Sequence, residues 1–250
     1  MSTINALQNV HGTIALAGAG KMGGAMLTGW LAGGLDAGRV VVIEPQPSPE
    51  ISALAAQGIR INPAAKDIGE VDTLVVSIMA GTTIASLEAV CGGSVVRAMP
   101  NTPAAIGRGI TVAVAARNVN AAQRAVADAL LRATGSVEWV DDESLMDAVT
   151  AVSGSGPAYI FLLAEELARA GVEAGLPQEL ATKLARETVA GSGELLHRSD
   201  APSATLRQNV TSPGGTTAAA LEVLMGPDGM QSLLTRAVAA ATRRSKELAK

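Results

Sequence analysis

The sequence has few cysteines, histidines and aromatic residues. Of its 250 residues, one is cysteine and two are histidine, and aromatic residues make up 2%. A single cysteine excludes an internal disulfide, so we expect Cys91 to be a small buried side chain in a reducing cytoplasm. His11 and His197 lie outside every motif described below and are expected to be exposed, and no cluster of metal ligands is evident. With so few rings and 27 glycines, the core must form by close approach of small side chains.

Positive charge and long apolar runs are scarce as well. Lys and Arg number 19 against 23 Asp and Glu, which gives a net charge of -4 and no local basic run. This balance argues against a nucleic-acid partner. No apolar run is long enough for a membrane span, and the start MSTINALQNVHG lacks a basic segment followed by an apolar one. The sequence therefore predicts a soluble, cytoplasmic globular protein.

The first part of the chain alternates short β-branched runs with Ala-rich helical stretches. The expected strands cover 13–17, 39–44, 59–61, 73–78, 94–98, 110–115 and 136–140, and the helices between them cover 22–33, 50–57, 83–90 and 120–133. This alternation predicts an α/β, Rossmann-type doubly wound and mostly parallel sheet over residues 1–142.

Strand patterns disappear after about residue 142, and residues 143–250 are expected to be all-helical. Helices are expected over 143–152, 157–174, 178–198 and 230–249, with Pro157 and Pro177 at helix starts. The segment 162–175 (LLAEELARAGVEAG) is apolar on more than one face, which favours a partner on its second side. A two-chain helical interface and a self-contained bundle are both compatible with this pattern.

A glycine-rich motif follows the first expected strand. In TIALAGAGKMGGAM, Gly18, Gly20 and Gly23 fit the G-x-G-x-x-G spacing at a strand–turn–helix junction. Such glycines permit a tight turn, approach of a pyrophosphate to the backbone and close packing of helix on strand. The motif predicts a dinucleotide site; the alternative is a purely structural glycine turn.

The end of the second expected strand bears on the choice of coenzyme. Glu44 lies where an acidic side chain binds the ribose hydroxyls and disfavours a 2′-phosphate. However, Ser48 could hydrogen-bond a phosphate, and Lys21 adds a positive charge nearby. The sequence therefore leaves NADPH and NADH both open.

Three further motifs combine glycine, proline and hydroxyl side chains. Met99, Pro100 and Asn101 follow a parallel strand, at the sheet edge where ligands bind; an ordinary Pro-bracketed turn would have the same pattern. Residues 151–161 (AVSGSGPAYIF) offer hydroxyls and N–H groups at a helix start, or only a tight corner. Residues 211–221 (TSPGGTTAAAL) predict an anion site built from backbone N–H groups, although a capped connector is the alternative.

Taken together and in this order, the motifs resemble the pyrroline-5-carboxylate reductase family. The segments that carry the resemblance cover nearly the whole chain: GAGKMGGAM, SIMAGTTIASLE, VVRAMPNTPAAIGRG, DAVTAVSGSGPAYIF and NVTSPGGTTAAALEVL. The resemblance implies reduction of 1-pyrroline-5-carboxylate to L-proline by NADPH or NADH, the final step of proline biosynthesis. It also implies a homodimer formed through the helical domain, with further assembly to a pentamer of dimers.

The resemblance assigns roles to residues of this chain. It implies that the coenzyme phosphates are held by Gly18, Gly20, Lys21, Met22 and Gly23, and that the nicotinamide is bordered by Met99, Pro100 and Asn101. It implies a cradle for the substrate carboxylate made of Ser212, Gly214, Gly215 and Thr216. Thr217 would hydrogen-bond the ring nitrogen. A protonated imine is already electrophilic, so orientation beneath the hydride donor replaces a strong acid–base pair.

One departure from the family pattern lies before residue 75. The family has a strand ending in a Val-Lys-Pro turn, then a helix, before the strand that leads into SIMAG. Here VDTLVVSIMAG joins the two strands directly, so one strand and one helix of the family pattern are missing from the sequence. Two explanations are open: the sheet is rebuilt with one strand fewer, or the sequence omits a stretch of the natural chain.

Two alternatives to this function remain at this point. A related imine or 2-hydroxyacid reductase would favour a catalytic Lys in the helix 157–174, which contains none. A non-catalytic dinucleotide-binding or assembly protein of the same fold would dimerise without turnover.

Overall fold

The computed structural model describes residues 7–8, 10–64, 67 and 74–248. The chain forms two compact units. The first comprises Met1–Gly154 with Arg243–Lys250, and the second comprises Ser155–Thr242. The short α5 (Met146–Val149) and the π-helix Thr150–Gly154 therefore pack with the strands of the first unit rather than with the long helices that follow them.

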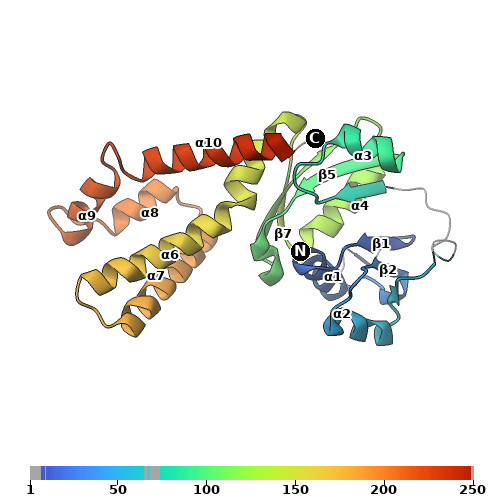
Figure 1. Cartoon of the computed structure of the whole chain (residues 1–250), viewed down its shortest axis with the longest axis horizontal. Coiled ribbons are helices and arrows are strands. Elements are labelled where there is room, and N and C mark those ends of the chain that lie inside the picture. The colour runs from blue at the N-terminus through green and yellow to red at the C-terminus, as the bar shows by residue number, and fades with distance from the viewer. Residues whose placement is uncertain (1–6, 9, 65–66, 68–73, 249–250) are drawn as a thin grey trace. The chain divides into compact units, whose positions relative to one another are not determined.

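The strands of the first unit form two small sheets (Figure 1). The first has the order β1-β2-β3, all parallel, and consists of β1 (Ile14–Ala17), β2 (Val40–Ile43) and β3 (Arg60–Ile61). The second has the order β4-β5-β6-β7 and consists of β4 (Leu74–Ser77), β5 (Ser94–Met99), β6 (Gly109–Ala115) and β7 (Gly135–Trp139). Among the described strands, only the β5–β6 pairing is antiparallel. All seven expected strands and their mostly parallel arrangement are confirmed, but the described strands form two sheets where one was expected.

Helices connect the strands, and their ends follow from local sequence. The α-helices are α1 (Lys21–Ala32), α2 (Pro49–Ala53), α3 (Ile84–Cys91) and α4 (Ala121–Arg132), and the 3₁₀ helices are Ala37–Arg39, Leu54–Gln57, Thr102–Ile106 and Glu143–Leu145. Asn120 and Gln123 form a reciprocal capping box at the start of α4. Thr83 caps α3 through the N–H of Ser86.

One hydrophobic core serves both sheets. It contains Val40 and Val42 of β2 together with Val96 of β5 and Ala113 of β6. Helix α1, which follows β1, contacts α4 directly: the Trp30 indole N–H donates to the carbonyl oxygen of Leu130 at 2.8 Å. Helix α1 follows a strand of the first sheet, and α4 lies between two strands of the second. The contact between these helices therefore joins the two sheets.

The second unit is helical (Figure 1, yellow to red). Its helices are α6 (Gly156–Glu173), α7 (Gln178–Arg198), α8 (Ser203–Asn209), α9 (Thr216–Leu224) and most of α10 (Met230–Leu248). Helices α6 and α7 lie side by side. Many large apolar side chains of this unit are exposed, including Phe161 at 68% and Val223 at 76%. Such unpartnered apolar surface is typical of an interface with another chain.

One expectation about the fold is wrong. Cys91 is exposed, not buried. It is the last residue of α3, in which Leu87 is the buried residue, and its neighbour Val90 is 85% exposed. The last turn of α3 therefore extends beyond the core. His11 and His197 are exposed, as expected.

Candidate functional site

The glycine-rich loop between β1 and α1 has the geometry of an anion-binding turn. Gly18 has φ +87, and its N–H donates to the carbonyl oxygen of Ile43 at 2.8 Å. Gly20 is the N-cap of α1, and nothing lies within 4 Å of the place where its Cβ would be. A Cβ on Gly23 would lie 2.0 Å from the Gly18 carbonyl oxygen, so only glycine allows this contact. The first-turn N–H groups of α1 therefore face an open, uncrowded loop.

Glu44, immediately after β2, is bound to this loop. Its carboxylate accepts the N–H of Ala19 at 2.9 Å through Oε2 and the N–H of Gln46 at 3.1 Å through Oε1. These two backbone hydrogen bonds, that of Ala19 first, lower the pKa of Glu44 below its ordinary value of 4.5. The carboxylate is consequently ionised at neutral pH and fixed beside the glycines.

Ser48 and Lys21, the residues that could favour a 2′-phosphate, lie at the starts of two different helices. Ser48 is the N-cap of α2, and its Oγ accepts the N–H of Ile51 at 3.3 Å. A hydrogen bond from Ser48 to the Glu50 side chain lowers the pKa of Glu50. Lys21, the first residue of α1, is exposed, and Met22 beside it is half-buried.

The turn after β5 meets the π-helix Thr150–Gly154. A Cβ on Gly154 would lie 2.5 Å from the Met99 terminal methyl, and Asn101 Nδ2 donates to Ser153 Oγ at 3.4 Å. Asn101 Oδ1 also accepts the N–H of Ile110 at 3.0 Å. Two separate sequence motifs therefore form one structural corner, with Met99 and Asn101 half-buried. Single-turn π-helices are frequent at functional sites.

The loop before α9 belongs to the second unit. Gly214 has φ +68, Gly215 is the N-cap of α9, and the Gly215 N–H donates to the Ser212 carbonyl oxygen at 3.1 Å. Ser212 and Thr216 are exposed and Thr217 is half-buried. Thr216 and Thr217 occupy the first turn of α9, so their hydroxyls and the N–H groups at the helix start lie together.

Reasoning from sequence missed two polar residues near these motifs. Asn62, directly after β3, has φ +48 and hydrogen-bonds to the backbone of Glu44. Its only signal in the sequence is an Asn between a β-branched run and a proline. Arg97 of β5, 5% exposed, pairs with Glu143 at 2.8 Å, and Glu143 also accepts the Ile84 N–H that begins α3. Nothing in the spacing of Arg97 and Glu143 indicates this contact.

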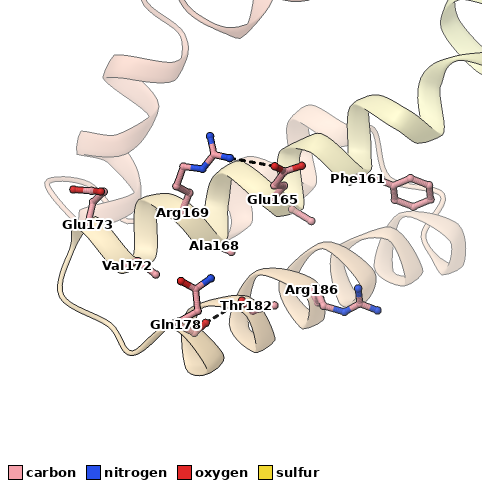
Figure 2. A pocket seen from close by; sticks show the side chains of 10 residues that line it. Phe161, Glu165, Ala168, Arg169, Val172, Glu173, Gln178, Thr182 and Arg186 are labelled. Carbon is pink, nitrogen blue, oxygen red and sulfur yellow. Dashed lines mark hydrogen bonds and ion pairs between the residues drawn. The ribbon is translucent and has the colours of Figure 1, made fainter.

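A pocket of about 480 Å³ lies between α6 and α7 (Figure 2). None of the individual residues expected to bind coenzyme or substrate lines it. Its walls carry the charged side chains Glu165, Arg169, Glu173 and Arg186, and Arg169 forms an ion pair with Glu165 (Figure 2). This pocket is accordingly not the candidate catalytic site.

Residues 7–8, 10–64, 67 and 74–248 include no group of three or more His, Cys, Asp and Glu side chains placed to hold a metal ion. No helix among them has the length and apolar character required to cross a membrane.

Comparison with known proteins gives consistent results. Residues 143–248 match the family model described as pyrroline-5-carboxylate reductase dimerisation. The chain is 44% identical over 212 residues to a pyrroline-5-carboxylate reductase of Pseudomonas aeruginosa, covering 84% of this chain and 74% of that one. It is 38% identical over 284 residues to that of Mycobacterium leprae, covering 94% and 96%. This second alignment is longer than the 250-residue chain itself, so part of the relative has no counterpart here.

Solved structures show the same likeness. A pyrroline-5-carboxylate reductase from Coxiella burnetii has a TM-score of 0.87 and 31% identity, covering 96% of this chain and all of that one. A pyrroline carboxylate reductase from Plasmodium falciparum, with NADP bound, has a TM-score of 0.79 and 27% identity, covering 98% and 100%.

Proposed function

Because this chain belongs to the pyrroline-5-carboxylate reductase family, we propose roles in that family's reaction for the residues described above. The protein is an NADPH- or NADH-dependent oxidoreductase that reduces 1-pyrroline-5-carboxylate to L-proline, the final step of proline biosynthesis. The observation that carries this conclusion is the 38% identity to the Mycobacterium leprae enzyme across nearly the whole of both chains.

The coenzyme phosphates are assigned to the loop between β1 and α1. The open space at Gly20 and the contact of Gly23 with Gly18 fit a pyrophosphate resting on the start of α1. Lys21 and Met22 follow in the first turn, where N–H groups and the positive helix end favour an anion. Glu44 and Ser48 are assigned to the ribose end. When bound, the dihydronicotinamide supplies the hydride.

The nicotinamide is assigned to the corner formed by Met99, Pro100 and Asn101 with the π-helix. Met99 offers a flexible apolar side chain that packs against a planar ring. The hydrogen bonds of Asn101 to Ser153 and Ile110 fix the turn that follows Met99, the last residue of β5. These residues would orient the ring and exclude water from one of its faces.

The substrate carboxylate is assigned to Ser212, Gly214, Gly215 and Thr216. Backbone N–H groups at the start of α9 and nearby hydroxyls suit a small anion without a basic side chain. Thr217 is assigned to the ring nitrogen of the imine, which its hydroxyl would hold in place. The carbon of a protonated imine needs little further activation, so the residues contribute mainly orientation.

The division of the chain into residues 1–142, for the coenzyme, and 143–250, for dimerisation and substrate, is part of this proposal. So is the loss of one strand–helix unit before residue 75. Among the described residues, β1 pairs only with β2 and β4 only with β5. Loss of a strand between β1 and β4 would leave each of them at the edge of a sheet while both sheets share one core.

The protein forms a homo-oligomer through the dimerisation region that residues 143–248 match. We propose that the subunit contact is a dimer of the helical units, supported by the exposed apolar side chains of α6 to α10. Assembly of five such dimers, and a cytoplasmic location, are further parts of the proposal.

The test of the reaction is direct detection of the product. Purified protein is incubated with 1-pyrroline-5-carboxylate and either coenzyme, and L-proline is measured by mass spectrometry. Proline that forms only when protein, substrate and reduced coenzyme are all present supports the assignment. Its absence with both coenzymes would refute it.

A further inference from the structure

Hydrogen bonds fix both the side chain and the main chain of Glu44. Its carboxylate accepts the N–H groups of Ala19 and Gln46 at 2.9 and 3.1 Å. The main chain of Glu44 makes two hydrogen bonds with the side-chain amide of Asn62. The Glu44 N–H donates to Asn62 Oδ1 at 2.9 Å, and Asn62 Nδ2 donates to the Glu44 carbonyl oxygen at 2.8 Å.

The conformation of Asn62 indicates that this double hydrogen bond matters. Asn62 has φ +48, a left-handed angle that costs energy for a residue other than glycine. Among the described residues it is the only one other than glycine with a positive φ. Its N–H donates to the carbonyl oxygen of Val42, which anchors it to the end of β2. In this backbone conformation the Asn62 side chain makes both hydrogen bonds to Glu44.

The segment that follows Glu44 disfavours a second anion. The segment from Pro45 to Ala53 contains no Lys or Arg and adds another carboxylate, Glu50. Hydrogen bonds to Ser48 and to its own backbone N–H lower the pKa of Glu50, so it too is charged at neutral pH. The Ser48 hydroxyl already caps α2 and bonds to Glu50, so a phosphate would have to displace it.

We propose that Glu44, positioned by Asn62, makes this chain select NADH over NADPH. A fixed carboxylate after the second strand accepts hydrogen bonds from a free ribose diol and repels a 2′-phosphate. Glu44 is the specificity-determining residue, and Asn62 is a positioning residue that acts through it. This inference rests on the proposed coenzyme site at the glycine-rich loop.

The test compares direct binding of the two coenzymes in the absence of substrate. Isothermal titration calorimetry gives a Kd for NADH and for NADPH with wild type, Glu44→Gln and Asn62→Gly. We expect NADH to bind about tenfold or more tightly in wild type, the effect of one repelled charge. Glu44→Gln should remove most of this preference. Asn62→Gly, which loses both hydrogen bonds to the Glu44 main chain, should reduce it about fivefold.

Two features of the design separate positioning from folding. Glycine accepts the left-handed backbone angle of Asn62, so Asn62→Gly removes the amide without straining the chain. Asn118→Gly is the matched control, because Asn118 Nδ2 also donates to a backbone carbonyl, that of Gly93, at 3.0 Å. The Asn118 variant should keep the wild-type ratio of the two Kd values.

Each contrary result has a distinct meaning. Equal or tighter binding of NADPH by wild type would overturn this inference and leave the reductase assignment intact. An unchanged ratio in Asn62→Gly would overturn the role of Asn62. Binding of neither coenzyme would overturn the coenzyme site and this inference together.

Discussion

The terminal methyl of Met99 fills the space in which a side chain on Gly154 would lie. A Cβ on Gly154 would be 2.5 Å from that methyl and 3.7 Å from the Thr150 side chain. Met99, which is assigned to the nicotinamide, can thus occupy its position because the residue 55 positions later in the chain, within the π-helix, has no side chain.

Gly154→Ala should displace Met99 without unfolding the protein. Methionine is flexible, so its methyl moves aside and the melting temperature changes little. Displacement of a residue at the nicotinamide should lower kcat/KM for the coenzyme by about tenfold. Gly156→Ala is the control, since nothing lies within 4 Å of its Cβ position. Equal steady-state kinetics for the two variants would contradict the role assigned to Met99.

Gly23→Ala should abolish tight coenzyme binding. The added methyl would lie 2.0 Å from the Gly18 carbonyl oxygen, so the loop must move. We expect the Kd of the preferred coenzyme to rise more than about tenfold. Gly24→Ala is a matched neighbour whose Cβ meets only the Ala19 carbonyl oxygen at 3.5 Å. Calorimetry should give this second variant the wild-type Kd, and weakening by both variants alike would contradict the account.

Thr217→Ala should lower turnover far more than coenzyme affinity. The variant loses the hydroxyl assigned to the imine nitrogen, and kcat should fall about tenfold or more. Thr217→Ser keeps the hydroxyl and should recover most of the rate. Thr205→Ala, at an exposed position on α8, serves as the control. Unchanged kcat in Thr217→Ala would remove Thr217 from the site.

Hydrogen exchange should reveal the split sheet. Strands β1 and β4 each pair on one side only within the described part of the chain, whereas β5 and β6 pair on both sides. Alternate amides of β1 and β4 should therefore exchange much faster than those of β5 and β6. Uniformly slow exchange across β1 and β4 would show that another strand covers these edges.

The charge of Glu44 should contribute to stability in a defined pH range. Its pKa in the folded protein lies below the ordinary 4.5, so its hydrogen bonds stabilise the fold above that pH. The contribution is lost as the pH falls below 4.5 through the folded value. The difference in melting temperature between wild type and Glu44→Gln should thus shrink on acidification below 4.5. A difference that stays constant would contradict this.

The sequence predicted the fold well because its signals are local. Alternation of β-branched runs with Ala-rich helices placed every strand, and the capping box at Asn120 follows from its own neighbours. The expected burial of Cys91 was wrong because the burial of a residue at a helix end depends on how far the core extends along the helix. Asn62 was missed because its role depends on pairing β3 with β2, which no local pattern specifies. The contact of Met99 with Gly154 joins two motifs that only the folded chain brings together.

Oxidation of reduced coenzyme by 1-pyrroline-5-carboxylate, followed by absorbance, tests the reductase activity of this chain. It requires protein whose intact mass matches 25.1 kDa, so that the apparent loss of a strand–helix unit belongs to the molecule assayed. We expect substrate-dependent loss of absorbance with NADH, slower loss with NADPH, and formation of proline in an amount equal to the coenzyme oxidised. Intact protein that oxidises neither coenzyme would contradict the account and leave a non-catalytic member of the family.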